Sequence, residues 1–199
     1  MRKLYPLLLF LLPLTALAQV DTVVVRPDSS FQSLFQRKLT DRRTNIRFDL
    51  LNRGQVRDVV FHLARIREIE SGKMLYALRI DQAQTISISS DMPLSEGSYL
   101  DEDELPLFIH YLDTLKNHIM PSARPMDMYS ELRYHTRSGL LLECFTAANR
   151  WRSILYYRVG DSSVSTQFNQ VERLDEILTI VRNVQREIGI YRKAEQKTG

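Results

Sequence analysis

Basic and aromatic side chains alternate along two segments in the second half of the chain, and this spacing has the clearest chemical potential. In an extended strand alternate residues share a face, so segments 129–136 and 151–159, with the residues that flank them, each present guanidinium, imidazole or phenol groups on one face. The residues concerned are Arg133, His135, Arg137, Arg152, Tyr156 and Arg158. Guanidiniums bind carboxylates or phosphates through paired hydrogen bonds, and tyrosines stack on sugars or acyl chains. If the two faces coincide, we expect a surface for an anionic glycan, a lipid headgroup or an acidic peptide.

A plain solvated face explains the same alternation. One face of an antiparallel sheet often lies in water, and arginine stems cover apolar surface well. Glu131 and Glu143 interleave with the basic residues, and mixed charge of this kind is typical of a wet face. Both interpretations stay open at this point.

Motifs that would indicate catalysis are missing from the sequence. There is no Gly-x-Ser-x-Gly nucleophile elbow, no phosphate-binding glycine loop, no His-Glu-x-x-His and no cysteine pair. His110 and Asp113 have helical ligand spacing, but they fall on the solvent side of a predicted helix. We therefore predict no catalytic residue, no metal ligand and no cofactor. A hydrolase that uses scattered histidine and aspartate residues remains an alternative.

The first 18 residues have the order of a cleavable secretory signal peptide. Arg2 and Lys3 precede the apolar run Leu7–Leu12, and Ala16-Leu17-Ala18 ends the segment with small residues before Gln19. The run is shorter than the roughly 20 apolar residues that a membrane helix needs. We expect export to the periplasm or the medium of a bacterium, with no transmembrane anchor after cleavage.

The charge balance of residues 19–199 argues against general nucleic-acid binding. Without Arg2 and Lys3 the chain holds 25 basic and 24 acidic residues, a net charge of +1. Cys144 is the only cysteine, so no disulfide can form within the chain. Its apolar neighbours predict a buried small hydrophobe rather than a reactive thiol.

Hydrophobic periodicity predicts an α+β protein. A helix is expected after a cap at Ser29 or Ser30, a second from the acids at 101–104 to Pro121, and a third that closes the chain. The two longer helices carry apolar stripes, formed by Leu105, Phe108, Ile109, Leu112, Leu115 and Ile119 and by Val171, Leu174, Ile177, Leu178, Val181, Val184 and Ile188. Strands are expected at 59–61, 65–70, 74–80, 84–90, 129–136, 140–145, 151–159 and 164–168, although 55–66 also fits helical spacing.

Two segments match in order and spacing and suggest an internal repeat. Ser71-Gly72 matches Ser138-Gly139 at an offset of 67, and the helical stripes match at an offset of 66. We predict two β-β-β-α units, whose strands form an antiparallel sheet with both helices on one face. The predicted organisation is a signal peptide (1–18), an extension with a short strand at 23–25 and a helix (19–54), the first unit (55–120), a linker (121–128), the second unit (129–192) and a polar tail (193–199).

These features together favour an exported, non-catalytic binding or interaction module whose ligand and partner the sequence leaves unknown. A cell-envelope hydrolase is one alternative. An envelope assembly factor that pairs through an exposed sheet edge is another.

Overall fold

The computed structural model describes residues 32–83, 97–122, 128–160 and 162–198. The predicted signal peptide 1–18, the predicted strands at 23–25 and 84–90, and most of the predicted linker 121–128 lie outside the described residues.

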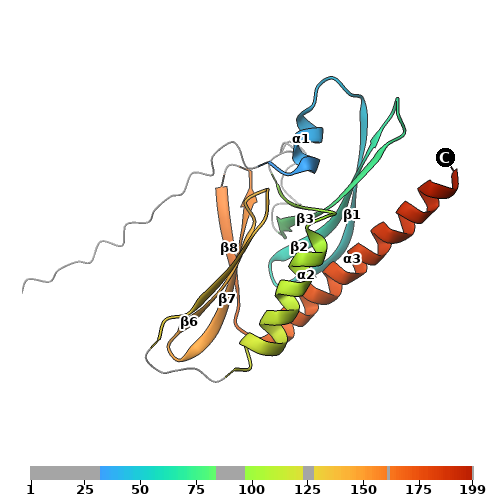
Figure 1. Ribbon diagram of the computed structural model, residues 1–199. Coiled ribbons are helices and arrows are strands. Elements are labelled where there is room, and N and C mark those ends of the chain that lie inside the picture. Colours follow the sequence, from blue (N-terminus) through green and yellow to red (C-terminus); the bar gives the residue numbers. More distant parts are fainter. Residues whose placement is uncertain (1–31, 84–96, 123–127, 161, 199) are drawn as a thin grey trace, which may run out of the picture.

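Two four-stranded antiparallel sheets and three helices make up the described fold (Figure 1). The first sheet has the order β1 (Ile46–Val56), β2 (Val59–Glu68), β3 (Met74–Gln82) and β4 (Ser98–Asp101). The second has the order β5 (Glu131–His135), β6 (Leu141–Ala147), β7 (Arg150–Val159) and β8 (Ser162–Phe168). The helices are α1 (Leu34–Thr40), α2 (Leu105–Thr114), which continues as the π-helical turn η1 (Leu115–Ile119), and α3 (Val171–Thr198). The predicted α+β class with antiparallel strands is confirmed.

The four strands expected in the second unit are all present, and the strands form two sheets rather than one. Two further strands precede α2, namely β1, most of which lies in the predicted extension, and the short β4. Ser71-Gly72 connects β2 to β3, whereas Ser138-Gly139 connects β5 to β6, so the two turns are not equivalent in element order. The helices do correspond, because α2 and α3 each follow a fourth strand. Gly97 bridges Val159 of β7, which brings the two sheets together.

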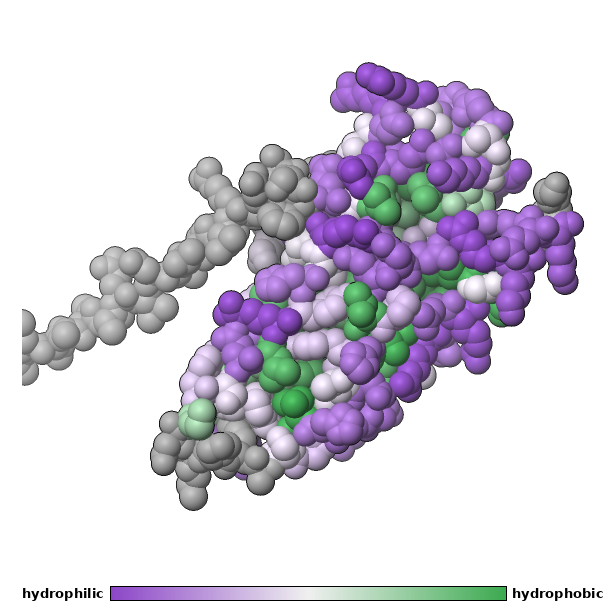
Figure 2. Space-filling view, in the orientation of Figure 1, coloured by the Kyte–Doolittle hydropathy of each residue, from purple (hydrophilic) through white to green (hydrophobic). Residues whose placement is uncertain are grey.

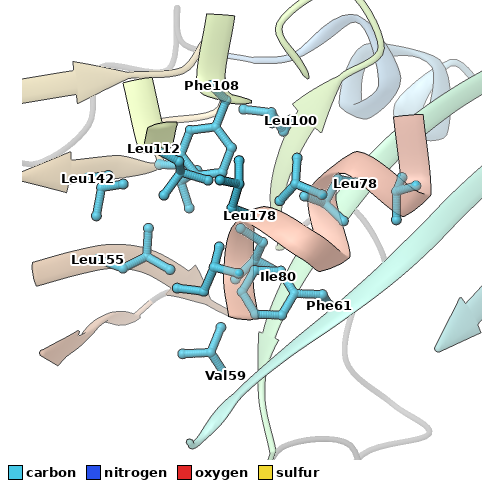
Figure 3. Close-up of a cluster of buried hydrophobic side chains, with 14 of the residues drawn as sticks. Val59, Phe61, Leu78, Ile80, Leu100, Phe108, Leu112, Leu142, Leu155 and Leu178 are labelled. Atoms are coloured by element: carbon cyan, nitrogen blue, oxygen red, sulfur yellow. The ribbon is translucent and has the colours of Figure 1, made fainter. Parts of the chain in front are cut away.

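One hydrophobic core joins both sheets to α2 and α3. The two helices contact each other and lay their apolar stripes on the sheets, as the spacing of those residues predicts. Figure 3 shows side chains from β2, β3, β4, β6 and β7 converging on the helices, among them Phe61, Leu78, Ile80, Leu100, Leu142 and Leu155 around Phe108, Leu112 and Leu178. Cys144 is fully buried in this core, as predicted.

The second face of the first sheet is also buried, which explains the ambiguous pattern at 55–66. Six successive residues of β2 from Val59 are buried, so the strand shows no alternation of apolar and polar residues. Part of that face is covered by α1, whose Phe35 stacks on Tyr99 with ring centroids 5.1 Å apart. Helix α1 begins after Ser33, which forms a capping box with Gln36. The Asp101 carboxylate accepts hydrogen bonds from the first backbone N–H groups of the helix.

Residues 193–198, expected as a polar tail, continue α3. Contacts with the first sheet hold this last part of the helix, because the Tyr76 hydroxyl donates to Glu195 and Arg192 donates to the backbone oxygen of Met74 at 3.2 Å. Figure 1 shows the C-terminal end of α3 beside the β2–β3 hairpin. Within the described ranges, no helix combines the length and apolar character needed to cross a membrane.

Candidate ligand-binding site

Five of the six residues predicted for a binding surface lie on one face of the second sheet. Arg133 and His135 lie on β5, and Arg152, Tyr156 and Arg158 lie on β7, with β6 between the two strands. The strand register forms two rows across β5, β6 and β7. Arg133, Glu143 and Ile154 form the first row, and His135, Leu141 and Tyr156 form the second. The intervening residues of β6 and β7 point into the core. We call this surface the open sheet face.

Arg133 and Arg137 are already engaged by carboxylates. Arg133 forms ion pairs with Glu131 beside it and with Glu143 across the ladder, the latter at 3.7 Å. Arg137 does not belong to the open sheet face. Its guanidinium lies 3.1 Å from Asp101 and also pairs with residues at the start of α2. Its main role is therefore to tie the β5–β6 turn to α2. Within the described ranges Arg152 and Arg158 form no side-chain ion pair, and binding by the open sheet face stays a prediction.

A groove of about 720 Å³ lies between the C-terminal turns of α3 and the hairpin ends of β1, β2 and β3. Its lining includes five basic side chains and two carboxylates, an excess of three positive charges. The basic residues are Arg47, Arg65, Arg67, Lys73 and Arg192, and the acidic residues are Asp49 and Glu195. We call this site the basic groove. It is a concave site.

Two arginines of the basic groove face each other directly. Arg47 of β1 is the cross-strand partner of Arg67 of β2, and in the next row on the same face Asp49 is the partner of Arg65. The single carboxylate of Asp49 accepts from Arg65 at 2.9 Å and from Arg47 at 3.2 Å. These guanidiniums hold the pKa of Asp49 below its ordinary value. Like charges opposite each other destabilise a ladder, so this row favours a bound anion.

Aromatic rings form the wall of the basic groove on the α3 side. Tyr76 of β3 and Tyr191 of α3 stack with ring centroids 5.7 Å apart and planes 12° apart. The Arg192 guanidinium lies over the Tyr76 ring at 4.8 Å, and that of Arg65 lies 5.9 Å from the Tyr191 ring. Burial, followed by the hydrogen bond to Glu195, raises the pKa of Tyr76 well above its ordinary value. The phenol therefore stays neutral. Tyr76 is buried, so the half-buried ring of Tyr191 supplies the accessible aromatic surface of the wall, beside fixed cations.

The chemistry of the basic groove is that of anion recognition. Guanidiniums can hold phosphate, sulfate or carboxylate oxygens with paired hydrogen bonds, and the Tyr191 ring can pack against a sugar or an alkyl segment. Arg67 and Lys73 form no side-chain ion pair within the part of the chain that the structure describes, so both cations are available. No histidine or cysteine lines the groove, and no cluster of metal-binding side chains occurs in the described ranges.

Sequence reasoning did not find the basic groove, although one signal was present. Arg65 and Arg67 are two residues apart, which places both on one face of a strand, and Arg47 and Asp49 have the same spacing. The segment 46–56 was not recognised as a strand. Pairing of Arg47 and Asp49 with Arg65 and Arg67 across two strands was therefore not expected. The tyrosine wall had no local signal, because Tyr76 and Tyr191 meet only through the packing of α3.

A second group of ionisable side chains is buried inside the first sheet. Arg79 donates to both carboxylate oxygens of Asp81 at 3.0 and 2.8 Å and to the Tyr99 hydroxyl at 3.0 Å. The Nε2 atom of His62 lies 3.7 Å from Asp81 and has no hydrogen-bond partner among the residues that the structure describes. His62 is only 4 % exposed, so this group lacks the access that a substrate would need.

Comparison of the chain with known protein families, with curated proteins and with solved structures finds no match.

Proposed function

We propose that this protein is an exported, non-catalytic module that binds an anionic ligand in the basic groove. The observation that carries the proposal is the Arg47–Arg67 cross-strand pair inside a concave site with three excess positive charges. A folded chain that leaves two guanidiniums opposite each other, with one nearby carboxylate shared between Arg47 and Arg65, gains stability when an anion lies between them. Export rests on the sequence of residues 1–18 alone.

The basic groove is a stronger candidate than the open sheet face for two physical reasons. Its cations come from β1, β2, the β2–β3 turn and α3 and converge on one concave site, whereas the cations of the open sheet face lie on two strands. The cations of the groove also exceed its carboxylates, while Arg133 on the open sheet face is balanced by Glu131 and Glu143.

The test compares two charge-matched double variants by calorimetric titration at low ionic strength. Arg47→Gln/Arg67→Gln removes two positive charges from the basic groove, and Arg152→Gln/Arg158→Gln removes two from the open sheet face. The probes are glycerol 3-phosphate, a sulfated oligosaccharide and hexaglutamate, which represent the headgroup, glycan and peptide classes. We expect the groove variant to lose at least about tenfold in affinity for the bound class, since each charged hydrogen bond contributes roughly 1.5–3 kcal/mol. The control variant should bind as the original protein does.

The opposite pattern, in which only Arg152→Gln/Arg158→Gln loses affinity, would move the site to the open sheet face. Saturable binding by none of the three probes at millimolar concentration would reject the anion-binding function itself. Affinity should also fall as salt is added, because charges at the protein surface are screened within about 10 Å at 0.1 M ionic strength.

A further inference from the structure

A second, mostly apolar groove of about 680 Å³ adjoins the basic groove. It lies between the start of α1, the start of α2, β3 and the C-terminal half of α3. Its accessible apolar surface comes mainly from Leu34, Leu75 and Pro106, with the buried side chains of Phe35, Leu105 and Ile188 beneath them. Three carboxylates also line it, those of Asp101, Glu102 and Asp103. In Figure 2 a strip of hydrophobic surface lies between α1 and the C-terminal half of α3, framed by hydrophilic side chains. We call this site the apolar groove.

The two grooves share Tyr76 and Arg192. Arg192 donates to Glu102, which lines the apolar groove, and to Glu195, which lines the basic groove, at 3.0 Å. Its guanidinium lies over the Tyr76 ring. A tyrosine ring and a guanidinium held by hydrogen bonds therefore separate the two grooves. A ligand can lie across them, with its apolar part in one groove and its charged part in the other.

The open edge of β3 explains why the apolar groove exists. Pairing between β3 and β4 begins at Ala77 with Asp101, so Leu75 and Tyr76 extend beyond the end of β4. Leu34 is 45 % exposed beside them. A further feature keeps the groove open on the α3 side, because Gly189 lines it and a Cβ atom added there would meet no atom within 4 Å.

We infer that the ligand is a single anionic amphiphile, with its acidic head in the basic groove and an alkyl or acyl chain in the apolar groove. The inference rests on the proposed function, because the head is held by the same guanidiniums. Charge complementarity fixes which end enters which groove. An exposed apolar groove next to an excess of positive charge fits one molecule that carries both characters, and each methylene buried in the apolar groove should strengthen binding about two- to fourfold.

The experiment titrates the purified full chain with inorganic phosphate and with butyl, hexyl and octyl phosphate below their micelle concentrations. We expect affinity to rise at least about tenfold from butyl to octyl phosphate, given the gain per methylene. Gly189→Phe should fill the apolar groove and abolish most of this rise, while the affinity for inorganic phosphate stays unchanged. The fold should tolerate this variant, since the added side chain enters open space and phenylalanine has a higher helix propensity than glycine.

Ile190→Phe is the matched control, because Ile190 is the next residue of α3, is 60 % exposed and lines neither groove. Its chain-length dependence should equal that of the original protein. Binding of all four phosphates with one affinity would overturn the amphiphile inference and leave anion binding in the basic groove intact. A chain-length dependence that Gly189→Phe leaves unchanged would also overturn it, since the alkyl chain would then lie elsewhere.

Two further outcomes separate the inference from the proposed function. If no phosphate binds saturably, both are wrong. Adsorption to vesicles of anionic phospholipid without binding of the monomeric alkyl phosphates would indicate attachment to a membrane surface and would likewise overturn the inference.

Discussion

Arg47 and Arg67 face each other across the β1–β2 ladder on the side of the first sheet that α3 partly covers. Asp49, one row further along, pairs with Arg47 and Arg65 together, and Arg67 has no ion-pair partner in the described part of the chain. The two positive charges repel each other at a point where the basic groove is open to a ligand.

Replacing Arg67 should therefore change stability and binding in opposite directions. Arg67→Gln relieves the repulsion with Arg47, and we expect the free energy of unfolding of the free protein to rise slightly, by up to about 0.5 kcal/mol. The same change should weaken phosphate binding. Urea unfolding at low ionic strength and calorimetric titration measure the two quantities. A loss of stability in Arg67→Gln would show that this side chain serves the fold and would argue against its role in the site.

Arg137 should prove a structural residue, in contrast to Arg152. Its guanidinium is surrounded by Asp101, Asp103 and Glu104, so Arg137→Leu leaves three carboxylates close together without a cation. We expect a loss of about 1 kcal/mol in unfolding free energy, a modest value because the side chain is partly exposed and its ion pairs are screened. Arg152→Leu, which breaks no ion pair in the described structure, should change stability by less than about 0.5 kcal/mol. Equal losses in the two variants would contradict this assignment.

Gly54 should tolerate substitution less well than Gly72. Gly54 lies at the register shift of β1 with φ 148°, and a Cβ atom there would come within 2.8 Å of Ile180 of α3. Gly54→Ala should destabilise the protein by about 2–3 kcal/mol, because backbone strain and the contact with α3 add together. Gly72 also has positive φ but faces open space, so Gly72→Ala should lose only about 1 kcal/mol. Thermal unfolding of both variants gives the comparison, and a ranking in the reverse order would be inconsistent with the close approach of β1 to α3.

His62 should make the protein less stable in mild acid. Burial lowers the pKa of His62 below its ordinary value of 6.5, and Asp81 only partly opposes this effect. The unfolded chain then takes up the proton more readily than the folded chain, so the stability present above pH 6.5 is lost as the pH falls below it toward the lowered folded pKa. The loss from this residue should reach at most about 1.4 kcal/mol at pH 5.5.

Urea unfolding at pH 7.5 and pH 5.5 tests this pH dependence against His62→Gln. The difference in unfolding free energy between the two pH values should be smaller in the variant, because glutamine does not titrate. An identical difference in both proteins would assign the pH dependence to other groups.

The sequence by itself determined the class of fold and most of its local elements. The apolar stripes of 105–119 and 171–188 predicted the two helices that cover the core, and β-forming segments on either side of Gly72 and Gly139 predicted two hairpins. These signals are local, since helical and strand periodicity is read over a few successive residues. The apolar neighbours of Cys144 are a local signal of the same kind. They predicted that its side chain is buried, and it is.

Strands without a clear period were missed for identifiable reasons. The register shift between Asn52 and Gly54 breaks the alternation in β1, and β4 has only four residues. Both faces of β2 are covered, which removes the period of two and leaves a pattern that also fits a helix.

Only the tertiary structure decided where cations and rings come together. Arg47 and Arg67 are opposed because the β1–β2 register pairs them, and Tyr76 meets Glu195 across 119 positions of sequence through the docking of α3. On the second sheet, register and packing assigned Arg137 to the start of α2 rather than to the open sheet face. Local sequence sets which face of an element a side chain occupies, but the neighbour it finds there depends on long-range pairing and packing, which no short window of residues encodes.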